Sequence, residues 1–415
     1  MNQSRSLTSI IGLLLSIGLV IGLVWGNYHF AEKNVGGEGF LIQWLSTRSL
    51  VVDGNNPYSA PVTSQIIETV KYENSFVKGN PPRYTSPLYS QVVIFPFALI
   101  ENNVLAHALW LTAQLISLYI ILLVGLKMTS WRPTWYAFLL FSMLTMFSYH
   151  VLIPWLDGGL SIWASLFLVV AFLAIRNNRN EIGGIFLALA TIQPQMTILV
   201  IIFTLLWVSS QRKITLIVWF LMTLIFISII GVFLVPDWIM QYLRLLYNFS
   251  KNFPSGSLGM LFRDLWPGLG TQLGWLVTGF SGILLLIEWW LALRKDFRWF
   301  LWTACLTMVV SLWIGIPIIP GNLIGLLLPL ILVAAMLTVH WPSGGQWMAI
   351  LMSLIVFVWE WALLYFDLSS SEPGMQLNLS IPLPLLLLIG LYWVRWWSIK
   401  PNRLLNGELR LGETY

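Results

Sequence analysis

The sequence contains a single cysteine, Cys305, and only four histidines in 415 residues. A lone cysteine inside an apolar run excludes an intrachain disulfide and a cysteine-based metal site. The histidines are scattered, and no two of them have the spacing of zinc ligands. We therefore expect no metal and no other resident cofactor.

Charged residues are also scarce. They make up 9% of the chain, against 58% hydrophobic residues and a mean hydropathy of +0.79. This balance excludes a soluble globular protein and predicts an integral membrane protein. The sequence also lacks the Gly-rich fingerprints of nucleotide-binding loops. The net charge of +5 comes from Lys and Arg in short turns between apolar runs, so it indicates orientation in a membrane and predicts no nucleic-acid partner.

The apolar runs predict an all-α, polytopic membrane helix bundle with about 11 to 13 transmembrane helices, forming one integral membrane domain over residues 1–415. One run, 88–100, is only 13 residues long. At about 1.5 Å per residue it is short for a hydrocarbon core of about 30 Å, and we expect it to enter the membrane and return. The other predicted spans are 7–27, 105–128, 133–149, 160–175, 182–207, 216–235, 270–293, 299–316, 321–340, 346–366 and 379–398.

The distribution of basic residues predicts the orientation of these spans. Arg5 precedes the first span, and Arg176 and Arg294 lie in turns assigned to the same side, so the N-terminus is expected in the cytoplasm of a cell whose plasma membrane holds the protein. No small-residue cleavage site follows the first span, which indicates a retained helix. This orientation places residues 28–87 and 236–269 in two extracytoplasmic loops and residues 400–415 in a cytoplasmic tail.

The predicted span 182–207 is interrupted by Gln193-Pro194-Gln195. A proline-centred hairpin of two half-spans preserves the orientation of the later turns. It would place Gln193 and Gln195 near the outer surface, like Asp157 in the outer segment between the spans 133–149 and 160–175. Polar groups at this depth line a cavity or join helices. Glu288 and Glu360 lie near span ends and are expected to reach the interface.

The stretch from Gly36 to Tyr89 differs from the rest, because charged residues, glycines and prolines alternate there with aromatic residues. Within it, residues 61–70 predict a short amphipathic helix with Val62 and Ile66 on its apolar face, lying on the bilayer surface. Trp238 and Tyr242 in the second loop suggest another surface helix.

Two acids of the first loop, Glu38 and Asp53, are candidates for a general base toward a sugar hydroxyl, because both stand in glycine-rich contexts that permit tight backbone geometry. The alternative is that they are solvated loop acids. Arginines on the outer side fit a lipid-linked phosphate, which Arg binds with two parallel hydrogen bonds, or else they form loop salt bridges. These candidates are Arg48, Arg83, Arg244 and Arg263.

Several motifs resemble those of glycosyltransferase family 87, within the C-type (GT-C) superfamily. The first loop contains Gly54-Asn55-Asn56-Pro57-Tyr58 and then Tyr84-Thr85-Ser86-Pro87-Leu88-Tyr89, which are similar to two family motifs. Phe40, Trp44 and Arg48 match a third, which reads Asp-Phe, an aromatic pair and Arg.

Two later motifs are similar in part. Asp157-Gly158-Gly159-Leu160 resembles a Gly-Asn/Gln-x-Asn motif, and Ala190-Thr191-Ile192-Gln193-Pro194 resembles Ala-x-x-Lys-Pro with Gln in place of Lys. One departure concerns the base: alignment on Phe40 puts Gly39 where the family has its catalytic Asp. Glu38, one residue earlier, is then the first candidate to replace that Asp as the catalytic base, and Asp53 is the second.

The resemblance implies a hexosyltransferase that moves a hexose, often mannose, from a polyprenyl-phosphate donor to a glycan, lipid or protein acceptor outside the membrane. It also implies that Glu38 or Asp53 is the catalytic base and that the reaction needs no metal ion. Residues expected to bind substrate are Arg48, Tyr58, Arg83, Tyr84, Asp157, Gln193, Gln195, Arg244 and Arg263.

Two other functions remain open from the sequence. One is a transporter or flippase of a lipid-linked sugar, although such proteins carry charged residues at mid-membrane and internal repeats that are not visible here. The other is a family member that has lost catalysis through the changes at Gly39 and Gln193.

Overall fold

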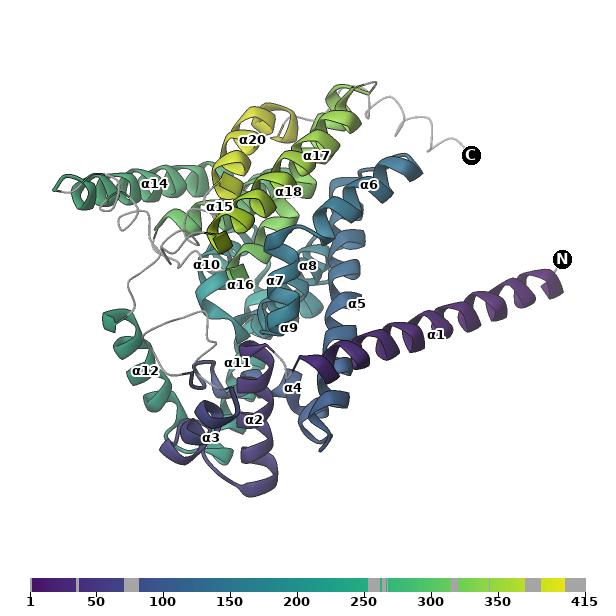
Figure 1. Ribbon diagram of the computed structural model, residues 1–415. Coiled ribbons are helices and arrows are strands. Elements are labelled where there is room, and N and C mark those ends of the chain that lie inside the picture. The colour runs from purple at the N-terminus through teal and green to yellow at the C-terminus, as the bar shows by residue number, and fades with distance from the viewer. Residues whose placement is uncertain are drawn as a thin grey trace. The chain divides into compact units, whose positions relative to one another are not determined.

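The computed structural model describes residues 2–34, 37–70, 82–252, 262, 266, 268–314, 320–342, 344–369 and 382–399. These residues form helices joined by short turns, with no strand among them (Figure 1). The all-α fold predicted from the apolar runs is therefore confirmed. The helices are α1 (Asn2–Lys33), α2 (Glu38–Asp53), α3 (Ala60–Val70), η2 (Leu88–Ser90), α4 (Gln91–Ala98), α5 (Asn103–Thr129), α6 (Trp135–Met146), α7 (Tyr149–Asp157), α8 (Ser161–Arg176), α9 (Asn180–Leu189), η3 (Ala190–Ile192), α10 (Pro194–Ser210), α11 (Ile214–Leu234), α12 (Trp238–Asn252), α14 (Gly270–Ala292), α15 (Phe297–Ile314), α16 (Pro320–Leu323), η4 (Ile324–Leu326), α17 (Leu327–His340), α18 (Gly345–Ser369) and α20 (Pro382–Ile399).

Six described helices are long and apolar enough to cross a membrane: α5, α11, α14, α15, the helix over Gly321–His340, and α18. A seventh span results if α6 and α7, bent by 56° at their junction, are counted together. These spans make the chain a multi-pass membrane protein. The predicted total of 11 to 13 also includes α1 and shorter apolar helices such as α4, α8 and α10.

The break at Gln193 is confirmed. The helix that begins at Asn180 ends in the 3₁₀ turn η3, and Pro194 opens α10 as its first residue. Proline suits that position because its missing N–H would have no partner there.

The chain divides into two compact units. The first consists of Met1–Leu118, Trp155–Leu160 and Ile230–Leu246, and the second consists of Tyr119–Pro154, Ser161–Ile229 and Tyr247–Tyr415.

In the first unit, α2 packs against α3 and α4. Val62 and Ile66 of the predicted amphipathic helix are buried, so protein rather than lipid covers them. Asn27 of α1 donates to the Thr112 hydroxyl of α5 at 2.9 Å. The start of α12 joins this unit through an apolar cluster of Leu50, Leu88, Val235, Trp238 and Tyr242.

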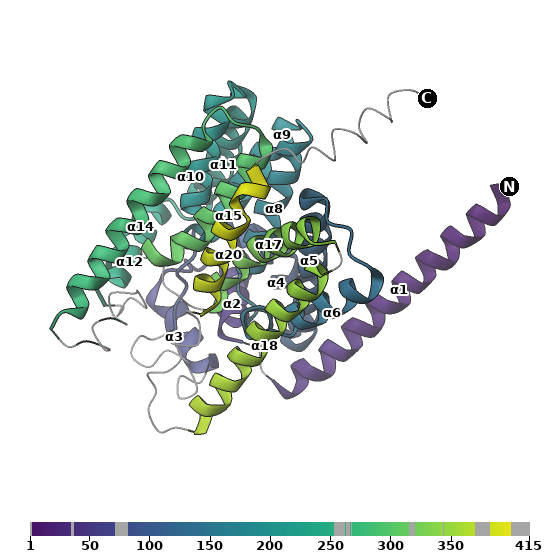
Figure 2. The same ribbon diagram turned by 90° about the horizontal axis from the view of Figure 1, so that it is seen from above.

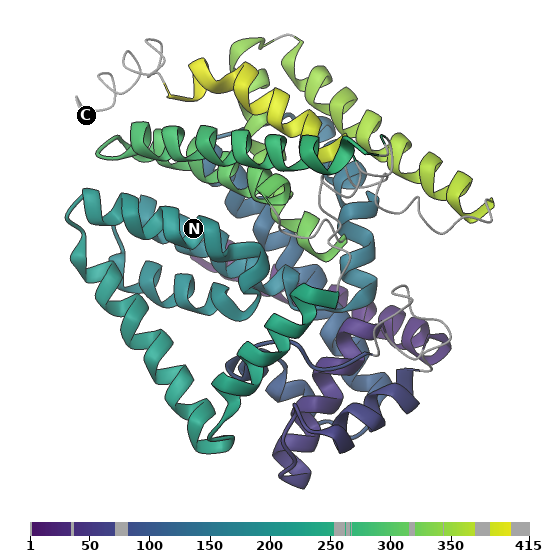
Figure 3. The ribbon, with the colours of Figure 1, turned by 90° about the vertical axis from the view of Figure 1, so that its left-hand side faces the viewer.

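In the second unit, α15 and α17 are the most buried spans, and they contact each other as well as α20 (Figure 2). Figure 3 shows α14 and α20 running along α15. The indole of Trp302 on α15 donates to the Leu391 carbonyl of α20 at 2.9 Å. Buried aromatic side chains with a satisfied polar atom thus fix these helices to one another.

Two acids expected at the interface are instead buried and paired in the second unit. Glu360 lies within α18, and both its carboxylate oxygens lie 3.1 Å from Nδ1 of His150. Glu288 of α14 accepts from Arg395 of α20 at 2.9 Å. The expectation failed because α18 and α14 pack against neighbours that supply partners for these carboxylates, and hydrogen-bonded pairing makes buried charge tolerable.

The predicted end of the span 133–149 is also wrong in part, because a second helix, α7, covers Tyr149–Asp157. The Ser148 carbonyl accepts the N–H groups of Val151 and Leu152 at 3.1 and 2.8 Å, which starts a new helix directly after the bend. The helix ends before Gly158, whose φ of +72° is a left-handed conformation that favours glycine.

A side chain at Gly184 should destabilise the second unit. A β-carbon there would lie 2.8 Å from both the Phe220 nitrogen and the Trp219 β-carbon of α11. The helix that contains Gly184 and α11 would therefore have to move apart. We expect Gly184→Val to cost about 1–3 kcal/mol, measured by thermal unfolding in detergent. Gly279→Val is the matched control, since no atom lies within 4 Å of that position on α14. Equal melting temperatures of the two variants would contradict this packing.

Candidate active site

The carboxylate of Asp157, the last residue of α7, lies at the N-terminal end of α2. The Gly39 N–H donates to its Oδ1 at 3.0 Å, and the Gly159 N–H also donates to this carboxylate. Gly37, the residue that caps α2, has no side chain to accept these first N–H groups. Asp157 therefore performs the capping role from a distant segment, in the position where the helix dipole favours negative charge.

Glycines allow the two segments to meet. A β-carbon at Gly39 would collide with Oδ2 of Asp157 and would lie 2.8 Å from the Gly159 nitrogen. A β-carbon at Gly158 would lie 2.7 Å from that of Phe40. We call residues 37–40 and 157–159 together the α2–α7 junction. Because only glycine permits this approach, the junction fixes the Asp157 carboxylate against α2.

Side chains of helix α5 also bind the α2–α7 junction. The Trp110 indole donates to the Gly158 carbonyl and the Gln114 amide to the Gly159 carbonyl, both at 2.7 Å. The Trp155 indole donates to the Leu111 carbonyl at 3.0 Å. These bonds satisfy the main chain that follows α7 and leave little freedom in the position of Asp157.

His107 lies beside the junction with both ring nitrogens unpartnered. Its ring stacks on Phe40 with centroids 4.6 Å apart, and it is only 1% exposed. The Oε1 atoms of Gln43 and Gln114 are also buried without a partner. An unsatisfied buried polar group costs about 1–3 kcal/mol, so such groups are usually kept where water or substrate satisfies them. This part of the first unit is therefore the candidate binding region.

Three residues named from the family resemblance lie on one face of α2, at intervals of four. Phe40 and Trp44 are buried, and Arg48 is partly buried. The Trp44 indole donates to the Phe97 carbonyl at 3.2 Å, and Arg48 donates to the Ala98 carbonyl at 3.3 Å while lying over the Trp44 ring. Trp44 and Arg48 thus reach the end of α4, whereas Phe40 contacts His107 and Trp110 of α5.

The two tyrosines expected to bind substrate make internal hydrogen bonds. The Tyr58 hydroxyl donates to the Ser86 carbonyl at 2.8 Å, and the Tyr84 hydroxyl to the Pro87 carbonyl at 3.0 Å. Burial raises the pKa of both phenols above their usual range. Both stay neutral at physiological pH and hold the main chain at Ser86 and Pro87.

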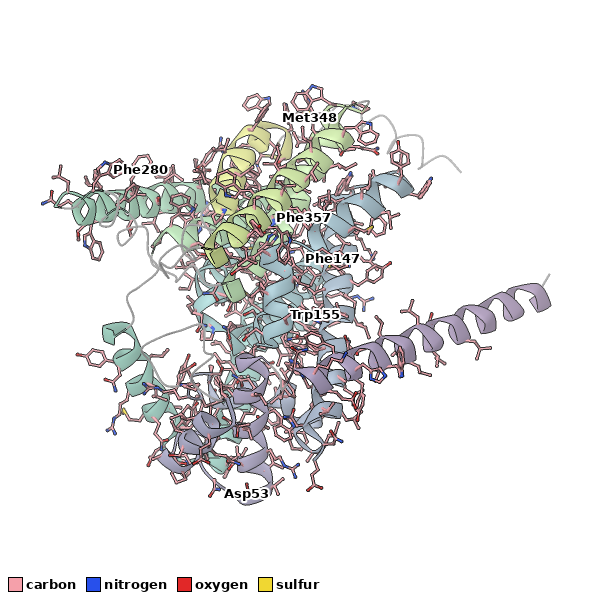
Figure 4. The ribbon with its side chains drawn as sticks, viewed as in Figure 1. Asp53, Phe147, Trp155, Phe280, Met348 and Phe357 are labelled. Carbon is pink, nitrogen blue, oxygen red and sulfur yellow. The ribbon has the colours of Figure 1, made fainter. Side chains whose placement is uncertain are left out.

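The remaining predicted residues of the first unit are less sheltered. Asp53 is exposed at the last residue of α2, about 22 Å along the helix from Glu38 at about 1.5 Å per residue. Figure 4 shows Asp53 at the end of the unit remote from Trp155. Arg83 is partly buried, and Arg244 is exposed on α12. The side chain of Glu38 and all of Arg263 lie outside the described residues.

Gln193 and Gln195 lie in the second unit, where Gln193 is partly buried and Gln195 is exposed. A cavity in this unit is lined by Leu168, Met196, Asn322 and others, with a volume of about 10 Å³. That volume holds about one water molecule and excludes a sugar. The described residues of the chain contain no group of three His, Cys, Asp or Glu side chains placed to bind a metal ion.

Sequence reasoning did not find His107, Trp110 and Gln114. They occur at positions i, i+3 and i+7 of a predicted span, which is one face of a helix. A histidine and a glutamine on the same face of an otherwise apolar helix are a signal of function or of interhelical hydrogen bonding.

The family model that matches the chain is glycosyltransferase family 87, over residues 84–317, which is more than half of the sequence. The match includes α5 and the Asp157 segment and begins after α2. Neither the curated proteins nor the solved structures that were compared include a significant match. The chain belongs to glycosyltransferase family 87 and is a membrane glycosyltransferase.

Proposed function

We propose that this protein transfers a hexose, with mannose as the first candidate, from a polyprenyl-phosphate donor to an acceptor at the outer face of the plasma membrane. The N-terminus then lies in the cytoplasm. The observation that supports the proposal most strongly is a partly buried carboxylate held at the N-terminal end of α2 in a chain of family 87.

The reaction needs one displacement at the anomeric carbon of the sugar. The acceptor oxygen forms a bond to this carbon while the bond to the phosphate oxygen breaks, and the bonding electron pair leaves with the polyprenyl phosphate. A carboxylate takes the hydroxyl proton of the acceptor. Glu38 and Asp53 are the candidates from sequence, and the geometry around Asp157 adds a third. Because the leaving group is a stable anion, the base mainly activates the acceptor.

The phosphate of the donor needs cationic partners. Arg48 and Arg83 are partly buried in the first unit and suit this role better than an exposed side chain, because desolvated charge–charge hydrogen bonds are stronger. Arg244, which is exposed on α12, would assist, and Arg263 stays a proposal from the sequence. Tyr58 and Tyr84 are further proposed substrate-binding residues of the first unit, and Gln193 and Gln195 of the second unit stay proposals from the sequence.

The direct test is transfer by the purified protein. The protein in detergent micelles is incubated with radiolabelled polyprenyl-phosphate mannose and a panel of glycan, lipid and peptide acceptors. Label appearing in an acceptor supports the proposal. Movement of intact donor across vesicle membranes without bond cleavage would favour a flippase, and absence of both activities with all hexose donors would favour a lapsed enzyme.

Arg48→Lys should raise the KM for the donor about tenfold while changing kcat little. Lysine keeps the charge but loses the planar fork that binds a phosphate with two hydrogen bonds and stacks on Trp44. Steady-state kinetics with varied donor concentration measure the effect. Arg298→Lys, at an exposed position on α15, is the matched control. An unchanged KM in Arg48→Lys would remove Arg48 from the donor site.

A further inference from the structure

The acidic side chains of the first unit differ sharply in exposure. Among those that the structure describes, Asp157 is the one that is not exposed. A general base must be sheltered enough to act on a bound hydroxyl and open enough to reach it. The exposed acids are Glu32, Asp53, Glu68, Glu101 and Asp237.

The position of this carboxylate is also informative. Its Oδ2 occupies the space that any side chain at Gly39 would need, and Gly39 stands where the resemblance places the catalytic acid. Asp157, at the end of α7, therefore supplies a carboxyl group next to Gly39, which has none. Gly39 and Asp157 are 118 residues apart in sequence, so only the fold brings them together.

Buried polar atoms near Asp157 are free to bind a polar ligand. The Gly39 and Gly159 N–H groups both donate to the carboxylate. His107, buried and with both ring nitrogens unpartnered, stacks on the adjacent Phe40. A sugar hydroxyl or phosphate oxygen can satisfy an imidazole nitrogen of this kind.

We infer that Asp157 is the catalytic base of this enzyme. The inference rests on the proposed function. Its carboxylate removes the proton from the acceptor hydroxyl as that oxygen bonds to the anomeric carbon, and the electron pair of the broken C–O bond leaves on the polyprenyl phosphate. The proton on Asp157 then passes to water when the product leaves.

Asp157→Asn tests this role with the least structural change, because an amide oxygen can still accept the Gly39 N–H. We expect transfer to fall about a hundredfold or more, while the loss of a charge at the end of α2 lowers the melting temperature only slightly. Asp157→Gly is the second variant, and formate added to it can occupy the vacated position and restore transfer at least tenfold. Glu101→Gln, an exposed acid of the same unit, is the matched control.

The outcomes separate the two proposals. No transfer by the wild-type protein with any donor would overturn the proposed function and this inference with it. Transfer by the wild type and by a folded Asp157→Asn variant at similar rates would overturn the inference alone, as would loss of transfer confined to Glu38→Gln or Asp53→Asn. If Asp157→Asn does not fold, the formate experiment on Asp157→Gly is the test. Recovery of transfer on adding formate upholds the assignment. A folded Asp157→Gly variant that does not respond to formate overturns it.

Discussion

Replacing Gly39 by valine should reduce transfer by about a hundredfold or more. The new β-carbon would collide with Oδ2 of Asp157 and lie 2.8 Å from the Gly159 nitrogen, so the carboxylate must move away from α2. A displacement of about 1 Å in a catalytic group is enough for a loss of this size. Initial rates of sugar transfer by the purified variant measure the effect.

The control for Gly39→Val is Gly26→Ala on α1, where no atom lies within 4 Å of an added β-carbon. This exchange should leave transfer unchanged, and alanine is also the better helix former. Melting temperatures of both variants separate local displacement from unfolding. A folded Gly39→Val variant with wild-type rates would show that the α2–α7 junction does not position the reaction.

Replacing Glu360 by alanine should destabilise the second unit by about 3–5 kcal/mol. The change leaves His150, which is 1% exposed, without its carboxylate partner at 3.1 Å. Breaking a buried pair by removing one member is costly because the polar atom left behind, here Nδ1 of His150, stays buried without a partner. Thermal unfolding in detergent, followed by a fluorescent probe of Cys305 exposure, measures the loss, because this thiol is buried in the same unit.

The double variant His150→Leu/Glu360→Leu is the informative comparison for that prediction. Removing both polar groups should cost much less than Glu360→Ala, since apolar replacements of a buried pair are often near neutral. Glu68→Ala, at an exposed position on α3, controls for the loss of an acid as such. The prediction fails if Glu360→Ala melts within a degree of the wild type.

The membrane-spanning helices were largely predictable, because lipid imposes the same requirement on each of them. A span needs about 20 apolar residues, and runs such as 105–128 and 216–235 correspond closely to α5 and α11. Pro194 likewise indicated where a helix must stop. Such signals are local in sequence, so no tertiary contact is needed to interpret them.

Helix α2 was not predicted, because its residues show no apolar stripe. Polar Gln43, Ser46 and Thr47 are buried together with Phe40 and Trp44. A helix that is buried on most sides has no polar solvent face, so its sequence lacks the 3.6-residue alternation of apolar and polar residues that identifies a helix. The sequence therefore suggested an irregular loop at the place where the structure has a buried helix.

The candidate site was predictable only in part, for a related reason. The motif resemblance named Asp157, Phe40, Trp44 and Arg48, and the glycines around Glu38 indicated unusual backbone geometry. The contact between Gly39 and Asp157, however, joins positions 118 residues apart, and His107 enters from α5. The spacing of residues along the chain does not predict contacts between positions so far apart.

The anomeric configuration of the product tests the central claim most directly. A single displacement assisted by a carboxylate base inverts the configuration at the sugar carbon, whereas a carboxylate acting as nucleophile would form a covalent intermediate and retain it. Proton NMR of the product made by the wild-type protein from a donor of known configuration distinguishes the two. This account predicts inversion, and a product with the configuration of the donor would contradict it.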